Sequence, residues 1–173
     1  HRGQPVAVAA GDDVDTALEV SGSLALEGIV VKDPVAPYRP GVRSDQWLKV
    51  KFTRTQEVVI GGIRPGKGGR TGEIGSLLVG WQTDDGLHYA GRVGSGFSEA
   101  TLASLDRRLQ PLRSDDDPFL DVPRADASDA LWVRPELVGE VEFGEVTPGG
   151  ILRHARWRGL RLDKDPGEVV LEA

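Results

Sequence analysis

The order of the apolar segments after Thr55 constrains the fold of this chain more than any other feature. Three short segments with strand character come first: 56–63, 76–81 and 87–93. Ser98 then provides a good N-cap for a helix, whose leucines recur at steps of three and four residues. These are Leu102, Leu105, Leu109 and Leu112. Further strands are predicted after an acidic, proline-containing linker that runs to about Ala130: 131–133, 138–146 and 152–157.

Three strands, a helix and then more strands, within roughly 110 residues, is the order of an OB-fold barrel, where a helix plugs the barrel between the third and fourth strands. An unrelated small α+β domain gives the same coarse pattern and stays open as an alternative. We expect a mainly β fold, with an OB-fold barrel and one plug helix over residues 54–173.

Residues 1–53 have a different pattern of apolar and polar residues, which predicts part of an α+β segment. A short helix is expected from about Val14 to Leu24 and a buried strand over 27–32. Three prolines then interrupt regular structure. The segment 47–51 alternates apolar and charged side chains, which predicts a strand with two lysines on one face.

The composition excludes some classes of protein. Without cysteine the chain has no disulfide and no thiolate metal site, and no stretch is long and apolar enough to span a bilayer. A net charge of -6 argues against coating nucleic acid through charge alone, although basic residues gather between Arg153 and Lys164. The sequence contains no methionine, so we expect His1 to lie inside a longer polypeptide; trimming of a short leader is the alternative.

Three segments carry residues suited to phosphate and metal chemistry. Glu27 begins a strand and is a candidate ligand for a divalent cation. Lys49 and Lys51 lie two residues apart, so both side chains point to one face of a strand. The segment 153–164 is rich in arginine, which binds phosphate through paired donors. Taken singly, each segment also fits an ordinary solvent-exposed surface.

Together the order and spacing of these segments resemble motifs IV, V and VI of the covalent nucleotidyltransferases, the superfamily of ATP-dependent DNA ligases and mRNA capping enzymes. The segments 38–44 and 75–80 resemble those of ligases, and the resemblance covers about residues 24–164. It is closest to bacterial ligases of the end-joining and repair type. It implies that residues 1–53 are the end of the adenylation domain and residues 54–173 its OB-fold domain.

The resemblance also implies roles for single residues. Glu27 would bind the catalytic Mg²⁺ or Mn²⁺. Arg43 and Lys49 would contact ATP or its phosphates, and Lys51 would support the same pocket. The C-terminal motif would swing over the active site during enzyme adenylylation and orient the leaving pyrophosphate; its residues are Arg161, Asp163 and Lys164.

One departure from the family pattern is decisive for activity. The nucleophilic lysine of a Lys-x-Asp-Gly tetrad is absent from this sequence, so we expect the chain alone not to adenylylate itself. It is therefore predicted to be a C-terminal part of a ligase that seals nicks through enzyme-AMP and DNA-adenylate intermediates. A fragment of a capping guanylyltransferase that uses GTP, or a non-catalytic OB-fold module that binds nucleic acid, are the alternatives.

The predicted partners are nicked or broken duplex DNA, and other repair proteins or domains of the same polypeptide, in the cytoplasm of a bacterium near the nucleoid. A glycine-rich basic loop is expected to approach the DNA backbone, unless it is only a surface hairpin. Its cations are Arg64, Lys67 and Arg70. Trp81, Tyr89 and Trp132 sit in apolar strands and are expected in the core, whereas His88 and His154 lack metal-ligand spacing.

Overall fold

The computed structural model describes residues 14–23, 28–33, 35, 41, 47–51, 54–66, 68 and 73–172. The side chains of residues 22, 23, 49 and 51 lie outside this description. The chain divides into two compact units, His1–Phe52 and Thr53–Ala173, and each is described by itself. Among the described helices, none is long and apolar enough to cross a membrane.

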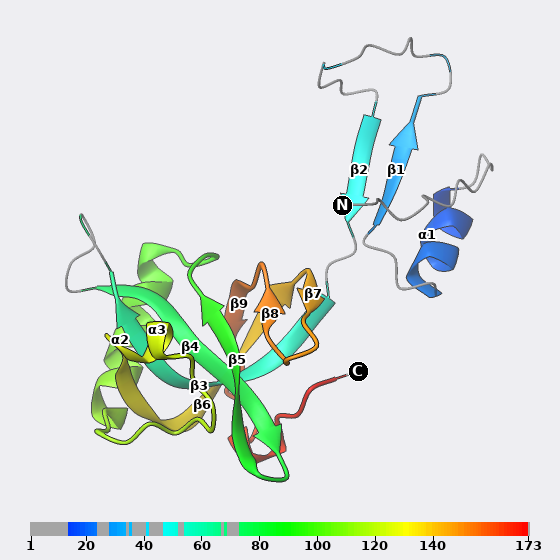
Figure 1. Ribbon diagram of the computed structural model, residues 1–173. Helices are drawn as coiled ribbons and strands as arrows, with labels where there is room; N and C mark the ends of the chain where they lie inside the picture. The colour runs from blue at the N-terminus through cyan, green and yellow to red at the C-terminus, as the bar shows by residue number, and fades with distance from the viewer. Residues whose placement is uncertain are drawn as a thin grey trace. The chain divides into compact units, whose positions relative to one another are not determined.

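The described residues of the first unit form one helix and one hairpin (Figure 1). Helix α1 spans Val14–Ser23, and the strands β1 (Gly28–Lys32) and β2 (Trp47–Lys51) pair antiparallel. All three elements were predicted from the sequence. The prediction that the first strand is buried was wrong, because Val30 is 49% exposed. At the end of the hairpin, the Lys32 ammonium lies 4.2 Å from the centre of the Trp47 ring, a cation–π contact.

The second unit is built on a five-stranded antiparallel sheet in the order β5-β4-β3-β6-β9 (Figure 1). Its strands are β3 (Arg54–Pro65), β4 (Ile74–Thr83), β5 (Gly86–Val93), β6 (Leu131–Phe143) and β9 (Arg156–Leu160). The two outer strands approach each other where the Trp157 amide donates to the Ser95 carbonyl at 2.9 Å. The sheet thus closes on itself as a barrel, as predicted for an OB-fold.

The predicted plug helix is present. Helix α2 spans Glu99–Leu109 and is capped by Ser98, whose hydroxyl accepts the Thr101 amide at 3.1 Å. Leu105 and Leu109 are fully buried, and the leucine stripe continues to Leu112 in the short 3-10 helix η2 (Gln110–Leu112). The apolar stripe of the helix therefore packs into the core, as its spacing indicated.

The segment between Leu131 and Arg156 differs from the prediction. β6 is one long strand rather than two. Its pairing with β3 passes from Trp132 directly to Leu137, so the strand bulges there and Pro135 lies outside the ladder. The predicted last strand is divided into β8 (Leu152–Arg153), which pairs with β7 (Glu145–Val146), and β9. His154 separates them with a left-handed backbone, φ 58°, which breaks the strand. A four-residue helix α3 (Arg124–Ala127) inside the acidic linker was not predicted.

The barrel core is apolar and rich in aromatic rings. Trp81 and Tyr89 are buried, and the Tyr89 and Phe119 rings meet edge to face with centroids 5.5 Å apart. Trp132 is partly buried against the same core, and the centroid of its ring lies 6.2 Å from that of the Phe119 ring. These positions confirm that the predicted core aromatics are not exposed stacking platforms. Gly139 gives room to the Trp157 indole, since a β-carbon there would overlap the ring.

The C-terminal segment after β9 is fastened to the barrel. The buried Gln56 amide donates to the Val170 carbonyl at 2.8 Å and accepts the Glu172 amide at 3.0 Å. On β4, the backbone N–H of Gln82 donates to the Val169 carbonyl at 2.7 Å. A 3-10 helix, η3 (Pro166–Glu168), lies between these anchors and β9. The residues that follow Leu160 are therefore held at a fixed place on the barrel.

Candidate functional site

The predicted phosphate-contacting residues of the C-terminal motif lie on the turn that follows β9. The Arg161 amide still donates to the Val138 carbonyl of β6 at 2.8 Å, and the Lys164 amide donates back to the Arg161 carbonyl at 3.3 Å. Because the turn is closed by these bonds and followed by the anchored tail, the side chains of Arg161, Asp163 and Lys164 start from one short, ordered stretch of backbone.

Arg161 is at the centre of a group of ion pairs. Its guanidinium donates twice to Asp163, with Nε–Oδ1 and Nη2–Oδ2 distances of 3.0 and 2.9 Å. Its Nη1 lies 2.8 Å from Glu57 Oε1 and 3.4 Å from Glu140 Oε2. Lys164 Nζ lies 3.1 Å from the same Glu57 Oε1. We call these five residues the Arg161 cluster: Glu57, Glu140, Arg161, Asp163 and Lys164.

Three carboxylates surround the two cations of the cluster. The hydrogen bonds from Arg161 lower the pKa of Asp163 to about 2, and the same bonds raise the pKa of Arg161 above its ordinary value. Both groups are therefore ionised at neutral pH. Glu57 is the most enclosed member, with a side chain 15% exposed, whereas the Lys164 side chain is 40% exposed. A guanidinium and an ammonium side by side can bind a phosphate, provided they exchange a protein carboxylate for it.

The sequence predicted the two cations and Asp163 but missed Glu57 and Glu140. Asp163 pairs with Arg161, and Lys164 is held by Glu57. A signal for Glu57 existed, since it is a carboxylate within a strand that is otherwise apolar from Val58 to Ile63. Its partners were unpredictable, because they depend on which strand lies beside β3.

Most other predicted site residues lie outside the described part of the chain. Glu27 and Arg43 are not described, and neither are the loop cations Lys67 and Arg70. Lys49 and Lys51 have a described backbone in β2, but their side chains are not described. Their assigned roles stay predictions.

Arg64 is described and is engaged within the barrel. Its Nη1 lies 3.0 Å from Asp126 Oδ1, and its Nε donates to Asp129. The Tyr89 hydroxyl donates to the other oxygen of Asp126 at 2.8 Å, and burial with this bond raises the pKa of Tyr89. Arg92 also approaches Asp126, at 3.4 Å. The network fastens α3 to β3 and β5, so Arg64 already has carboxylate partners in this structure.

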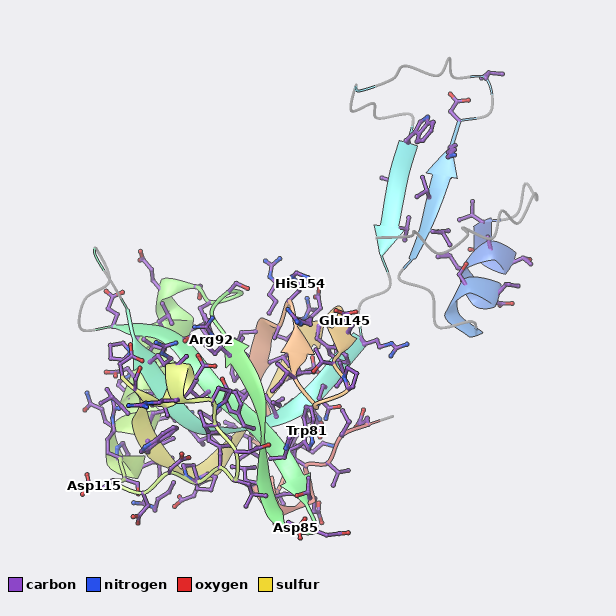
Figure 2. The ribbon with its side chains drawn as sticks, in the orientation of Figure 1. Trp81, Asp85, Arg92, Asp115, Glu145 and His154 are labelled. Atoms are coloured by element: carbon purple, nitrogen blue, oxygen red, sulfur yellow. The ribbon has the colours of Figure 1, made fainter. Side chains whose placement is uncertain are left out.

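A second basic surface surrounds the β8–β9 corner. Its exposed side chains come from the corner and from β9: Arg153, His154, Arg156 and Arg158. Arg158 Nη1 lies 3.4 Å from Glu142 Oε2. Figure 2 places His154 with Arg92 and Glu145 toward the upper part of the barrel in that view, away from Asp85 at the lower tip. Among the described residues, no group of three or more carboxylates or histidines is arranged to hold a metal ion.

Comparison with known families agrees with this arrangement. Residues 70–164 match the family described as the ATP dependent DNA ligase C terminal region, and residues 4–51 match the ATP dependent DNA ligase domain. The chain belongs to the ATP-dependent DNA ligase family. The two matches follow the order expected for an adenylation domain and an OB-fold domain, and they do not favour a capping enzyme.

Relatives within the ligase family are similar over most of this chain. The multifunctional non-homologous end joining protein LigD of Mycolicibacterium smegmatis is 48% identical over 161 residues, which are 92% of this chain and 21% of that protein. A DNA ligase of Natronomonas pharaonis is 32% identical over 91% of this chain and 29% of that protein. The chain spans about a fifth of the length of the LigD relatives it matches.

Solved ligase structures share the fold. The ligase domain of LigD from M. tuberculosis is 46% identical, with a TM-score of 0.68 over 92% of this chain and 52% of that structure. A mycobacterial DNA ligase D in complex with ATP matches with a TM-score of 0.64 at the same identity. A Lig E DNA ligase is similar in fold alone, with a TM-score of 0.55 at 24% identity.

Proposed function

We propose that this chain supplies the end of the adenylation domain and the OB-fold domain of a bacterial ATP-dependent ligase that seals nicked or broken duplex DNA during end joining. Residues 1–53 would be the end of the adenylation domain and 54–173 the OB-fold domain. The family matches and the similarity to LigD proteins support this proposal. Within the chain, the observation that carries it is the placement of Arg161 and Lys164 side by side on one anchored turn.

The chemistry of this chain would be electrostatic. In the first step of ligation, a lysine outside this sequence attacks the α-phosphate of ATP, and pyrophosphate leaves with developing negative charge. Arg161 and Lys164 would contact the departing phosphates and stabilise that charge. Asp163, bound to Arg161 through both oxygens, would keep the guanidinium plane in a fixed orientation. Arg43, Lys49 and Lys51 would contact the nucleotide from the other domain.

A divalent cation, Mg²⁺ or Mn²⁺, would neutralise phosphate charge in the same step. Glu27 is the residue proposed to hold it. The described residues offer no competing group of carboxylates, and the cations of the Arg161 cluster are suited to phosphate rather than to metal. The resemblance to the nucleotidyltransferase motif that begins with Glu27 is what supports this assignment.

Contact with DNA would come from two places on the barrel. The first is the loop between β3 and β4, with Lys67 and Arg70, whose root is fixed by the pairing of Arg64 with Asp126. The second is the exposed basic surface at the β8–β9 corner. Contacts to the phosphate backbone through such cations weaken as salt rises.

The proposal is tested by covalent labelling of a ligase that contains this chain together with a nucleophilic lysine. It is incubated with α-labelled ATP or GTP and then chased with nicked DNA. We expect AMP to label the protein and to move onto the 5′-phosphate of the nick, while the 173-residue chain alone takes up no label. Labelling by GTP would assign a capping activity instead, and absence of any label would favour a non-catalytic binding module.

A further inference from the structure

The two glutamates of the Arg161 cluster face each other across adjacent strands. Glu57 of β3 is the direct register partner of Glu140 of β6. Like charges in directly opposed positions of a sheet destabilise it unless a cation lies between them. Arg161 Nη1 contacts an oxygen of each glutamate and provides that cation. Arg161 therefore stabilises the two opposed carboxylates, and they in turn hold its guanidinium in place.

Glu57 differs from Glu140 in that it serves both cations. A single oxygen, Oε1, lies 2.8 Å from Arg161 Nη1 and 3.1 Å from Lys164 Nζ. One oxygen between a guanidinium and an ammonium has the donors that a phosphate oxygen would take. Glu57 thus occupies the position at which the two cations of the motif converge.

We propose that Glu57 is a positioning residue that acts as an internal counterion for Arg161 and Lys164, to be displaced by the polyphosphate end of the nucleotide. This rests on the proposed function of the two cations. Displacing the carboxylate costs the same free energy whichever phosphate compound binds, and a polyphosphate has more negative charges with which to offset that cost than a single phosphate has. Arg161 stays oriented during the exchange, since Asp163 binds its other donors through two hydrogen bonds.

The chain offers a matched control for this role. Glu142 lies two residues from Glu140 on the same strand and pairs with an arginine, Arg158, at 3.4 Å. Glu142→Gln removes the same charge as Glu57→Gln from the same sheet, without touching Arg161 or Lys164. A difference between the two variants therefore reports the local contact rather than the net charge of the protein.

The experiment is an NMR titration of the whole 173-residue chain with inorganic tripolyphosphate and, separately, with orthophosphate, following the backbone amides of residues 161–164. We expect Glu57→Gln to bind tripolyphosphate about three- to tenfold more tightly than the unaltered chain, as for loss of one partly exposed competing ion pair. Binding of orthophosphate should tighten as well, by no larger a factor, because the carboxylate that no longer competes is the same for both ligands. Glu142→Gln should change either affinity by less than about twofold.

Equal affinities for Glu57→Gln and Glu142→Gln, with tripolyphosphate binding lost in Lys164→Ala, would overturn the counterion role and leave the phosphate contact intact. No binding of tripolyphosphate by any of the proteins would contradict the phosphate contact itself, and the counterion role with it. If Glu57→Gln does not fold, Glu140→Gln is measured instead; it should tighten binding by a smaller factor, and unchanged or weaker binding would contradict the proposal.

Discussion

The barrel and the N-terminal hairpin differ in how far they bury similar apolar strand residues. Leu78 of β4 is fully buried, whereas Leu48 of β2 is 62% exposed. The barrel packs its apolar strand residues against its own plug helix and aromatic rings. In the described part of the hairpin, Val30 and Trp47 are also exposed, at 49% and 41%. The barrel therefore has a hydrophobic core of its own. We expect further residues of an adenylation domain to cover the apolar side chains of the hairpin.

The largest expected effect comes from this pair of leucines. Leu78→Ala should lower the free energy of unfolding of the barrel by about 2–5 kcal/mol, because it leaves a cavity in the core. Leu48→Ala should lower it by less than about 0.5 kcal/mol, as for a surface substitution. Urea denaturation followed by tryptophan fluorescence measures both. Similar losses for the two variants would break the distinction between the two units.

A close contact inside the barrel gives the next largest effect. Gly139→Ala should cost about 1–3 kcal/mol of stability, because the added methyl overlaps the Trp157 indole and the ring must move. Gly149→Ala is the control, since nothing lies within 4 Å of its added β-carbon. Thermal unfolding compares the two, and an unchanged midpoint for Gly139→Ala would show that the core is looser than its packing indicates.

The network around Asp126 should contribute less than the core. Asp126→Ala removes one of the two carboxylate partners of Arg64 and the partner of the Tyr89 hydroxyl, so we expect a loss of about 1–3 kcal/mol. Asp115→Ala, at an exposed bend of the same acidic segment, should change stability by less than about 0.5 kcal/mol. Urea midpoints test the difference, and equal midpoints would argue that α3 is not fastened through this carboxylate.

The smallest effect concerns the titration of Asp163. Its pKa is lowered to about 2 by Arg161, so the ion pair contributes stability above the ordinary aspartate pKa of about 4, and this contribution is lost as the pH falls through about 2. A carboxyl NMR titration should give a midpoint near 2 in the unaltered chain. In Arg161→Ala the midpoint should rise toward the ordinary pKa of an aspartate. An unchanged midpoint would contradict the pairing of Asp163 with Arg161.

Much of the barrel was predictable because its strands and helix are encoded locally. Turn residues, the Ser98 cap and the leucine spacing each act over a few residues. The resemblance of motif spacing singled out Arg161, Asp163 and Lys164, and the structure brings these three residues together on one turn. Their contact with phosphate stays a prediction. The sequence does not indicate the partners of Glu57, because they depend on β3 lying beside β6 and on where the turn after β9 ends. Long-range pairing of that kind leaves no local pattern.

The central claim is that Arg161 and Lys164 act on the phosphates of ATP in the first step of ligation. The direct measurement compares Arg161→Ala with Arg134→Ala, an exposed arginine paired with Glu136 at 2.7 Å, in a ligase that contains this chain. Single-turnover adenylylation by ATP is measured beside sealing of a nick that already carries AMP. We predict that Arg161→Ala slows adenylylation on the order of a hundredfold, as for loss of one donor to a developing anion, and largely retains sealing. Normal adenylylation by Arg161→Ala, or an equal loss in both steps, would contradict it.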